Sequence, residues 1–316
     1  MSSINTNMSA MTALQSLAQT NKDLAATQTR ISTGLRVSQA SDNAAYWSIA
    51  TTMRSDKLSL STVQDALGLG AAQVDVAYTA ANSAIDVVNQ IKAKLVAARQ
   101  PGIDRAKVQT EIKSLQDQLK SIADSASFSG DNWLSVDSSA ATYNATKNVV
   151  ASFTRTAGVA TIQTISIDTT GMSLFNADAA ATNANAGIID AKRAADGSID
   201  TAAGTFSISN LDISALTDST TDLATLDSYI KGADGAIKGM TSAAASFGAV
   251  KSRIGMQQTF VKALSDALDR GISALVDADM NEESTKLQAL QVKQQLGIQS
   301  LAIANSQTQI ILKLFQ

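Results

Sequence analysis

The chain has 316 residues, a formal net charge of −3, and neither cysteine nor histidine. The slightly acidic balance argues against a nucleic-acid partner, because surfaces that bind nucleic acid are strongly basic. The lack of cysteine and histidine excludes disulfides, thiol redox chemistry and every metal site or acid–base pair that depends on histidine.

The composition favours long helices. Proline occurs once, and aromatic residues make up 4% of the chain, so few residues interrupt a helix. The opening residues, "MSSINTNMSAMTALQSLAQTN", lack the positive region, the apolar run and the cleavage site of a secretory signal peptide. No stretch reaches about 18 consecutive apolar residues, so we expect neither a membrane-spanning helix nor a membrane partner.

The N-terminal segment has a heptad stripe but almost no charge to solvate its other side. No charged side chain precedes Lys22. The stripe consists of Leu14, Leu17, Asn21, Leu24, Gln28, Ile31 and Leu35. A helix of a soluble monomer normally has a charged outer face. The segment therefore predicts a helix whose outer face is covered by other subunits.

The clearest periodicity lies between Leu60 and Leu95. Apolar residues follow one another there at steps of three and four: Leu60, Val63, Leu67, Gly70, Val74, Ala77, Ala81, Ala84, Val88, Ile91 and Leu95. This stripe predicts the seam of a long helix packed closely in a left-handed bundle. Pro101-Gly102 ends the helix. A second stripe, from Val108 to Ala126, predicts a helix that folds back antiparallel.

The composition changes between about residues 140 and 230, which are rich in Thr, Ser, Ala, Gly and Asp. Within this region "TIQTISID" and "GTFSISN" alternate as strands do, so a small β-containing insert is predicted. Helical periodicity returns near Met240. We expect a terminal-helix domain (residues 1–43 with 277–316), a helical rod domain (44–139 with 232–276) and a variable insert (140–231).

The C-terminal stretch "LGIQSLAIANSQTQIILKLFQ" repeats the low charge of the N-terminal segment, with no charged side chain between Lys293 and Lys313. Its apolar residues form two stripes, one with Leu296, Ile303 and Ile310, the other with Ile298, Leu301 and Leu312. Two terminal helices cover each other on one side only, so one of these stripes is expected to pack on Leu14, Leu17, Leu24 and Ile31 of the same chain, which leaves the other stripe for neighbouring subunits. The predicted fold is mainly α: an elongated antiparallel helical coiled-coil rod with paired terminal helices and a small β-containing inserted domain.

The sequence contains no convincing enzymatic, cofactor or metal motif. Asp277, Asp279 and Asn281 stand at positions one, three and five of a calcium loop, but Glu282 replaces the glycine at position six and Gln288 the glutamate at position twelve. We expect these acidic residues to cap the start of a helix instead. The chain is therefore expected to have no catalytic activity, cofactor or metal.

Several motifs point to one family. "RISTGLRVSQASDNAAYWSIA" (Arg30–Ala50) resembles the N-terminal signature of bacterial flagellins, and "INTN", "FSGDNWL" and "DADMNEESTKLQALQVKQQLGIQSLAIANSQ" fit the same family. The resemblance covers roughly residues 2–136 and 240–316. Tyr46-Trp47 after the double alanine departs from the commoner glycine-containing version and is similar to flagellins of rhizobia-type α-proteobacteria.

The resemblance implies a self-polymerising filament subunit for swimming motility, secreted unfolded through the flagellar type III apparatus to the extracellular filament. The terminal helices would line an inner tube, the rod an outer tube, and the insert the surface. The implied partners are other flagellin subunits, including paralogues, together with an export chaperone and gate and the hook–filament junction and cap proteins.

One motif of the family is altered. Flagellins detected by the vertebrate innate receptor have a motif like Leu-Gln-Arg-x-Arg-Glu-Leu in the rod helix. It aligns with "NQIKAKL" (Asn89–Leu95), where Gln90 is retained and Ile91, Ala93 and Lys94 replace the two arginines and the glutamate. The resemblance therefore implies weak detection.

Two other functions remain open from the sequence. A hook–filament junction protein shares flagellin-like ends and differs in not forming long filaments. A signalling helical hairpin of the chemoreceptor type is equally rich in Ala, Ser, Thr and Gln, but it would need membrane segments and a helical tip at mid-chain, where this sequence predicts strands.

Overall fold

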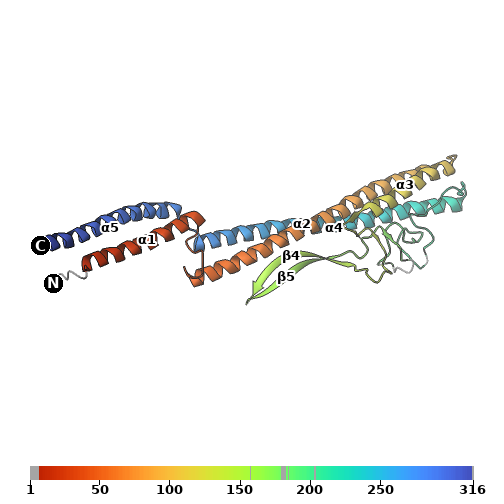
Figure 1. The fold of residues 1–316 in the computed structure, drawn as a ribbon. Coiled ribbons are helices and arrows are strands. Elements are labelled where there is room, and N and C mark those ends of the chain that lie inside the picture. Colours follow the sequence, from red (N-terminus) through yellow and green to blue (C-terminus); the bar gives the residue numbers. More distant parts are fainter. Residues whose placement is uncertain (1–6, 157, 179–182, 184, 203, 315–316) are drawn as a thin grey trace. The chain divides into compact units, whose positions relative to one another are not determined.

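The computed structural model describes residues 7–156, 158–178, 183, 185–202 and 204–314, with side chains as far as residue 306. The chain is mainly helical (Figure 1), with α1 (Met8–Thr33), α2 (Ala44–Ala98), α3 (Arg105–Ser125), α4 (Thr220–Val276) and α5 (Met280–Leu314). Helix α1 pairs with α5 and α2 with α4, and a small β-containing insertion lies between α3 and α4. The predicted fold class is confirmed. Among the described helices, none has an apolar stretch suited to crossing a bilayer.

The chain divides into two compact units. Unit 1 is formed by residues 1–58 with 264–316, and thus by α1, α5, the first part of α2 and the last part of α4. Unit 2 is formed by residues 59–263, which contain the rest of α2 and α4, together with α3 and the insert. The three-part division expected from the sequence stays a prediction.

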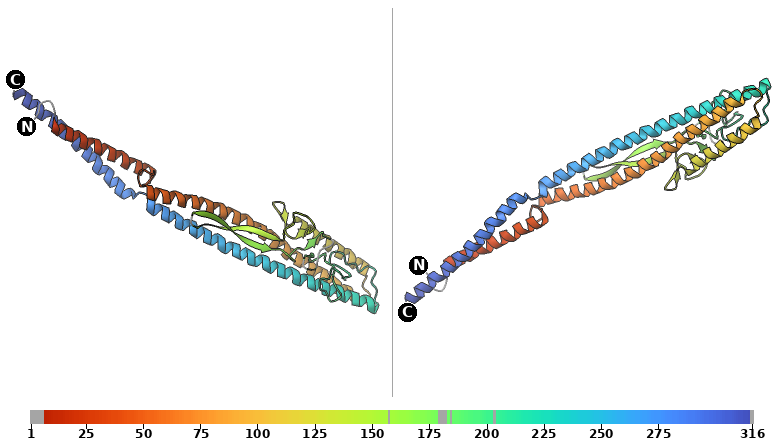
Figure 2. Two further views of the ribbon diagram at one scale, coloured as in Figure 1. Left: turned by 90° about the horizontal axis from the view of Figure 1, so that it is seen from below. Right: turned by 90° about the horizontal axis from the view of Figure 1, so that it is seen from above.

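In unit 2, α2 and α4 lie antiparallel, side by side in both views of Figure 2. Ion pairs join them at Arg99–Asp227 (2.5 Å), Lys92–Asp234 (2.5 Å) and Asp75–Lys251. The two residue numbers add up to the same total in each of these pairs, so they share one antiparallel register. All six side chains are partly exposed, and each pair therefore contributes modestly to stability.

The stripe on α2 faces the interior of unit 2. Its members are at most 5% exposed: Leu60, Val63, Leu67, Val74, Ala77, Ala81, Ala84, Val88, Ile91 and Leu95. Gly70 is buried as well, but against a strand. A Cβ atom at this position would lie 2.3 Å from Cγ1 of Val149, so only glycine lets this strand approach α2 so closely.

A buried arginine joins the segments at the α2–α3 turn. Asp104 caps α3 by accepting a hydrogen bond from the Lys107 backbone N–H. The Arg105 guanidinium, only 6% exposed, donates to the Ala98 carbonyl at the end of α2 (3.0 Å), to the Leu216 carbonyl (3.1 Å) and to Asp218 (2.5 Å). Charged hydrogen bonds of this kind are among the stronger ones in proteins, so Arg105 fixes the loop before α4 to the end of α2.

The insert and the segment before it contain paired strands, of which β4 and β5 are long and the others have two residues each. The antiparallel pairs are β1 (Ser127–Phe128) with β2 (Asp131–Asn132) and β4 (Thr146–Thr156) with β5 (Val159–Asp168). A register shift falls between Val150 and Ser152 in β4. β3 (Ser135–Val136) pairs in parallel with β6 (Phe175–Asn176). The predicted strand "TIQTISID" lies within β5, and the expectation of strands is confirmed there.

Two sequence expectations were wrong in detail. "GTFSISN" forms no strand: Phe206 makes an isolated bridge with Arg193, and Ser207 is buried along with its neighbours. A turn follows, in which the Asn210 side chain accepts from the Ser207 backbone N–H (3.1 Å). Helix α4 begins at Thr220 rather than near Met240. The apolar pattern did not reveal its first turns, because glycines at 232, 235 and 239 replace the apolar residues that would have marked its face.

Candidate functional site

Helix α1 stops at a glycine within the signature motif. Gly34 adopts a left-handed conformation (φ 72°), and its N–H donates to the Arg30 carbonyl at 2.8 Å. This backbone conformation strains other residues and is a common way to end a helix. The chain then turns, and Val37 enters a small core with Ala50, Ile272 and Val276.

The two segments that link the terminal helices to the longer helices pair with each other. We call residues 34–43 the first connector and residues 277–279 the second. The Arg36 and Val37 N–H groups donate to the Val276 carbonyl (2.7 and 3.2 Å), and the Ala278 N–H donates to the Gly34 carbonyl (2.9 Å). The Arg36 guanidinium also binds the Leu275 carbonyl (3.0 Å). Pairing satisfies backbone groups that the helix breaks would otherwise leave unbonded.

Acidic and amide side chains accept hydrogen bonds from backbone N–H groups just before α2 and at its first turn. Asp42 accepts from the backbone N–H groups of Gln39 (3.1 Å) and Ser38 (2.9 Å), and these bonds hold the pKa of its carboxyl below the usual value. Asn43 accepts from the Tyr46 N–H at the start of α2 (3.1 Å).

Asp279 caps α5 in the same manner, accepting from the Asn281 N–H at 2.9 Å. This is the capping role that the sequence favoured over a calcium loop. Among the described residues, no group of three or more acidic side chains could hold a metal ion.

An ion pair and amide contacts hold α1 against α5. Arg30 donates to the buried Glu283 at 3.2 Å. Farther along, the Gln294 side chain donates to Asn21 at 2.8 Å. Leu17 lies against Gly297, where an added Cβ would sit 3.1 Å from its Cδ1. Asn21, a polar member of the stripe, thus finds a hydrogen-bond partner inside the pair.

The sequence-selected residues of the terminal helices differ in burial. Leu17, Leu24, Ile31, Leu35 and Leu301 are half-buried in unit 1, whereas Leu14, Leu296, Ile298 and Ile303 are exposed. The side chains of Ile310 and Leu312 lie outside the described residues. Sequence reasoning missed four further exposed apolar residues on the described parts of these helices, Met8, Met11, Met280 and Val292.

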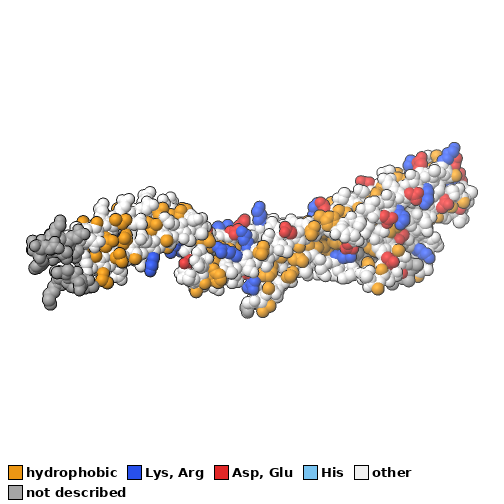
Figure 3. All heavy atoms as spheres, viewed as in Figure 1, with side chains coloured by type: hydrophobic (Ala, Val, Ile, Leu, Met, Phe, Trp, Pro, Cys, Tyr) orange, Lys and Arg blue, Asp and Glu red, His pale blue; other side chains and the backbone are white. Residues whose placement is uncertain are grey.

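On α5, Val292, Leu296 and Ile303 form an exposed apolar stripe on the side away from α1, whereas the exposed Ile298 lies on another side of the helix. Leu296 is 57% exposed and Ile303 60%, and Val292 continues the same face one turn earlier. The residues that contact α1, such as Gln294 and Gly297, lie about a quarter to half a turn around the helix. In Figure 3 the visible side of the terminal helices shows apolar side chains and few charged ones.

The altered receptor motif lies on α2 in unit 2. Ile91 is buried in the seam, Gln90 and Ala93 are exposed, and Lys94 pairs with Glu111 of α3 at 2.5 Å. The stretch therefore presents to solvent neither the arginines nor the glutamate of the detected motif.

Paired helices with exposed large apolar residues and little charge form a surface that packs against other protein. The fold and this surface define a structural subunit of a larger assembly. Comparison with known proteins agrees: the bacterial flagellin N-terminal helical region matches residues 4–139, and the bacterial flagellin C-terminal helical region matches residues 230–315.

Relatives match along the whole chain. Flagellin C of Rhizobium meliloti is 50% identical over 336 residues, and the flagellin of Brucella melitensis is 45% identical over 317 residues, with 100% of both chains covered in each case. Flagellin A of R. meliloti is 44% identical, again over 100% of both chains. The chain belongs to the bacterial flagellin family. It is a structural, non-enzymatic subunit of the extracellular flagellar filament that serves motility.

Proposed function

We propose that the outer faces of α1 and α5 are the surfaces through which this flagellin joins its neighbours in the filament. The observation that carries the proposal is the stripe of Val292, Leu296 and Ile303, which stays exposed after α1 and α5 have paired. Burying one such side chain contributes about 1.5–3 kcal/mol. A filament repeats the contact in every subunit, and the seam in unit 2 serves only the fold of each chain.

Replacing Leu296 and Ile303 together by serine tests this surface. Both side chains are exposed, so the monomer should keep its helical content and melting temperature. We expect the critical concentration for seeded polymerisation to rise by at least about tenfold, because 1.4 kcal/mol corresponds to a factor of ten. Circular dichroism and sedimentation measure the two effects.

The matched control replaces Gln291 and Gln295, two exposed polar residues of the same helix that lie to one side of the stripe, by serine. It should polymerise like the parent. Polymerisation of the Leu296, Ile303 double variant at the parent's critical concentration would contradict the proposal.

Co-assembly with other flagellins is part of the proposal. Flagellins A, B, C and D of R. meliloti are all similar to this chain over their full length, so several flagellins occur in one related organism. We propose that this chain shares filaments with paralogues through the same terminal helices. The export chaperone and gate and the junction and cap proteins would contact it before and during assembly.

Weak detection by the vertebrate innate receptor is expected from the region around Gln90. Arginine often contributes most to binding at such hot spots because its guanidinium makes paired hydrogen bonds. Here Ile91 is buried, Ala93 is small and Lys94 is engaged with Glu111. Reporter cells should respond far less to this protein than to a detected flagellin at equal concentration. An equal response would show that recognition does not depend on these positions.

A further inference from the structure

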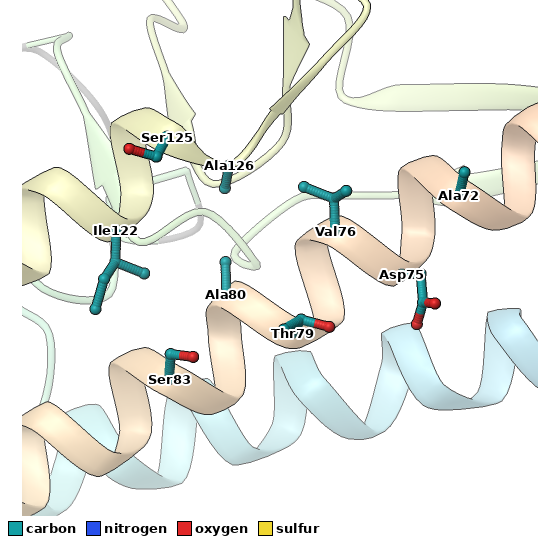
Figure 4. A pocket seen from close by; sticks show the side chains of 9 residues that line it. All are labelled: Ala72, Asp75, Val76, Thr79, Ala80, Ser83, Ile122, Ser125 and Ala126. Atoms are coloured by element: carbon teal, nitrogen blue, oxygen red, sulfur yellow. The ribbon is translucent and has the colours of Figure 1, made fainter.

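An apolar groove runs along α2 beside the end of α3 (Figure 4). Its volume is about 590 Å³. Val76 and Ala80 of α2 project toward Ile122 near the end of α3 and toward Ala126, which directly follows that helix; Thr79 of α2 also lines the groove. Asp75 at one edge points to α4, where it pairs with Lys251. The walls of the groove are therefore mainly apolar, and the charge of Asp75 at its edge is already paired with Lys251.

A complementary ridge lies on α4 of the same unit. Met256 is 66% exposed and Phe260 56%, and a spacing of four residues places both on one helix face. Arg253 precedes Met256 on this face and is exposed. It makes no ion pair within the part of the chain that the structure describes. Large exposed apolar residues next to a free cation are the usual composition of a binding ridge.

The direction of the helices decides how ridge and groove can meet. Copies in a filament are related by rotation about the axis and translation along it, so they point the same way. Since α2 and α4 are antiparallel within one chain, α4 of one copy meets α2 of the next antiparallel. In this antiparallel contact, residues of lower number on α4 lie beside residues of higher number on α2. Arg253 therefore lies beside a later α2 residue than Phe260 does.

The charges match in this orientation. Phe260 and Arg253 are as far apart in the sequence as Thr79 and Asp86 are. Each spacing corresponds to about two helical turns. Asp86 is exposed on the same face of α2 and makes no ion pair within the described residues. With Phe260 beside Thr79 and Met256 near Ser83, Arg253 lies opposite Asp86.

We infer that the Met256–Phe260 ridge of one copy fills the α2–α3 groove of the next copy, with Arg253 paired to Asp86. The two surfaces differ, so the contact is heterologous and extends from copy to copy instead of closing a dimer. The inference rests on the proposed function, because it presumes a polymer. It adds a contact in unit 2 that is separate from the terminal helices.

A charge exchange tests the contact. Asp86→Arg and Arg253→Asp each place like charges opposite one another between copies, and the chain with both substitutions restores an opposite pair. We expect each single variant to raise the critical concentration for seeded polymerisation at least about tenfold, and the double variant to return it toward the parent's. Phe260→Ser should behave like the single variants.

Lys262→Asp is the matched control, because it changes the same charge on α4 half a turn away from Arg253. It should polymerise like the parent, and circular dichroism should show all variants equally helical, since the substituted residues are exposed. Single variants that polymerise like the parent, or a double variant no better than the singles, would overturn the contact and leave the groove to a different partner. Failure of the parent to polymerise would instead overturn the proposed function.

Discussion

Deleting residues 297–316 should abolish polymerisation and leave unit 2 folded. The deletion removes Leu301 and Ile303 and the contact of Gly297 with Leu17, so α1 loses much of its partner and the outer stripe is cut short. Each lost apolar side chain removes about 1.5–3 kcal/mol of contact energy per subunit. The seam from Leu60 to Leu95 lies in unit 2 and needs none of these residues.

Sedimentation after seeding measures assembly of the truncated chain, and circular dichroism measures its helices, with the full-length chain as the control. The helical signal should fall only by the share that α1 and the deleted part of α5 contribute. Pelletable filaments from the truncated chain, or melting of the helices of unit 2 together with assembly, would show that the terminal helices do not have this separate role.

Replacing Arg193 by alanine should destabilise the insert by about 2–5 kcal/mol, through buried carbonyls left without donors and the cavity left by the side chain. The side chain is 2% exposed, and its guanidinium donates to the carbonyls of Ile188 (2.5 Å) and Gly197 (2.8 Å). Desolvation lowers the pKa of Arg193 to about 10. Without the side chain, two buried carbonyls lose their donors and a cavity remains.

Urea unfolding, followed by the near-ultraviolet signal of the Phe206–Tyr229 contact between insert and α4, measures this loss. Arg193→Met keeps the volume and should lose less, about 1–3 kcal/mol for the unpaired carbonyls. Lys192→Ala is the control: its side chain is exposed, and a change within about 0.5 kcal/mol is expected. An Arg193→Ala protein that unfolds at the parent's urea concentration would show that the insert is anchored elsewhere.

Long helices were predictable because their pattern is local. The stripe from Leu60 to Leu95 repeats over many turns, and such a repeat has one stable solution, a buried helix face. The Pro101-Gly102 turn and the strand at residues 161–168 were predictable for the same reason. Fold class and family therefore followed from the sequence.

The docking of the insert on α4 was not predictable, because it depends on contacts between distant segments. A Cβ atom at Gly235 would lie 2.4 Å from the Gly197 carbonyl oxygen, and one at Gly232 would lie 2.5 Å from the Phe206 ring. These glycines interrupt the apolar stripe of α4 and so hid its first turns. Nothing local marks Arg193 as a buried residue, since arginine is usually exposed.

At the candidate site, the sequence pointed to both terminal helices through their missing charge. The sequence also predicted that acidic residues such as Asp279 cap the start of α5. It did not predict the pairing of the two connectors, because Gly34 and Ala278 are far apart in the chain. It also left open which apolar residues α1 and α5 cover for each other. That partition depends on the rotation of each helix about its axis, which periodicity alone does not determine.

The central claim is that the apolar stripe of α5 is buried between copies in the filament. Electron cryomicroscopy of filaments grown from the purified chain on seeds at physiological salt measures this directly. The account predicts a filament in which Val292, Leu296 and Ile303 contact neighbouring subunits. A filament in which these side chains remain exposed to solvent, or a chain that forms no filament on seeds, would contradict it.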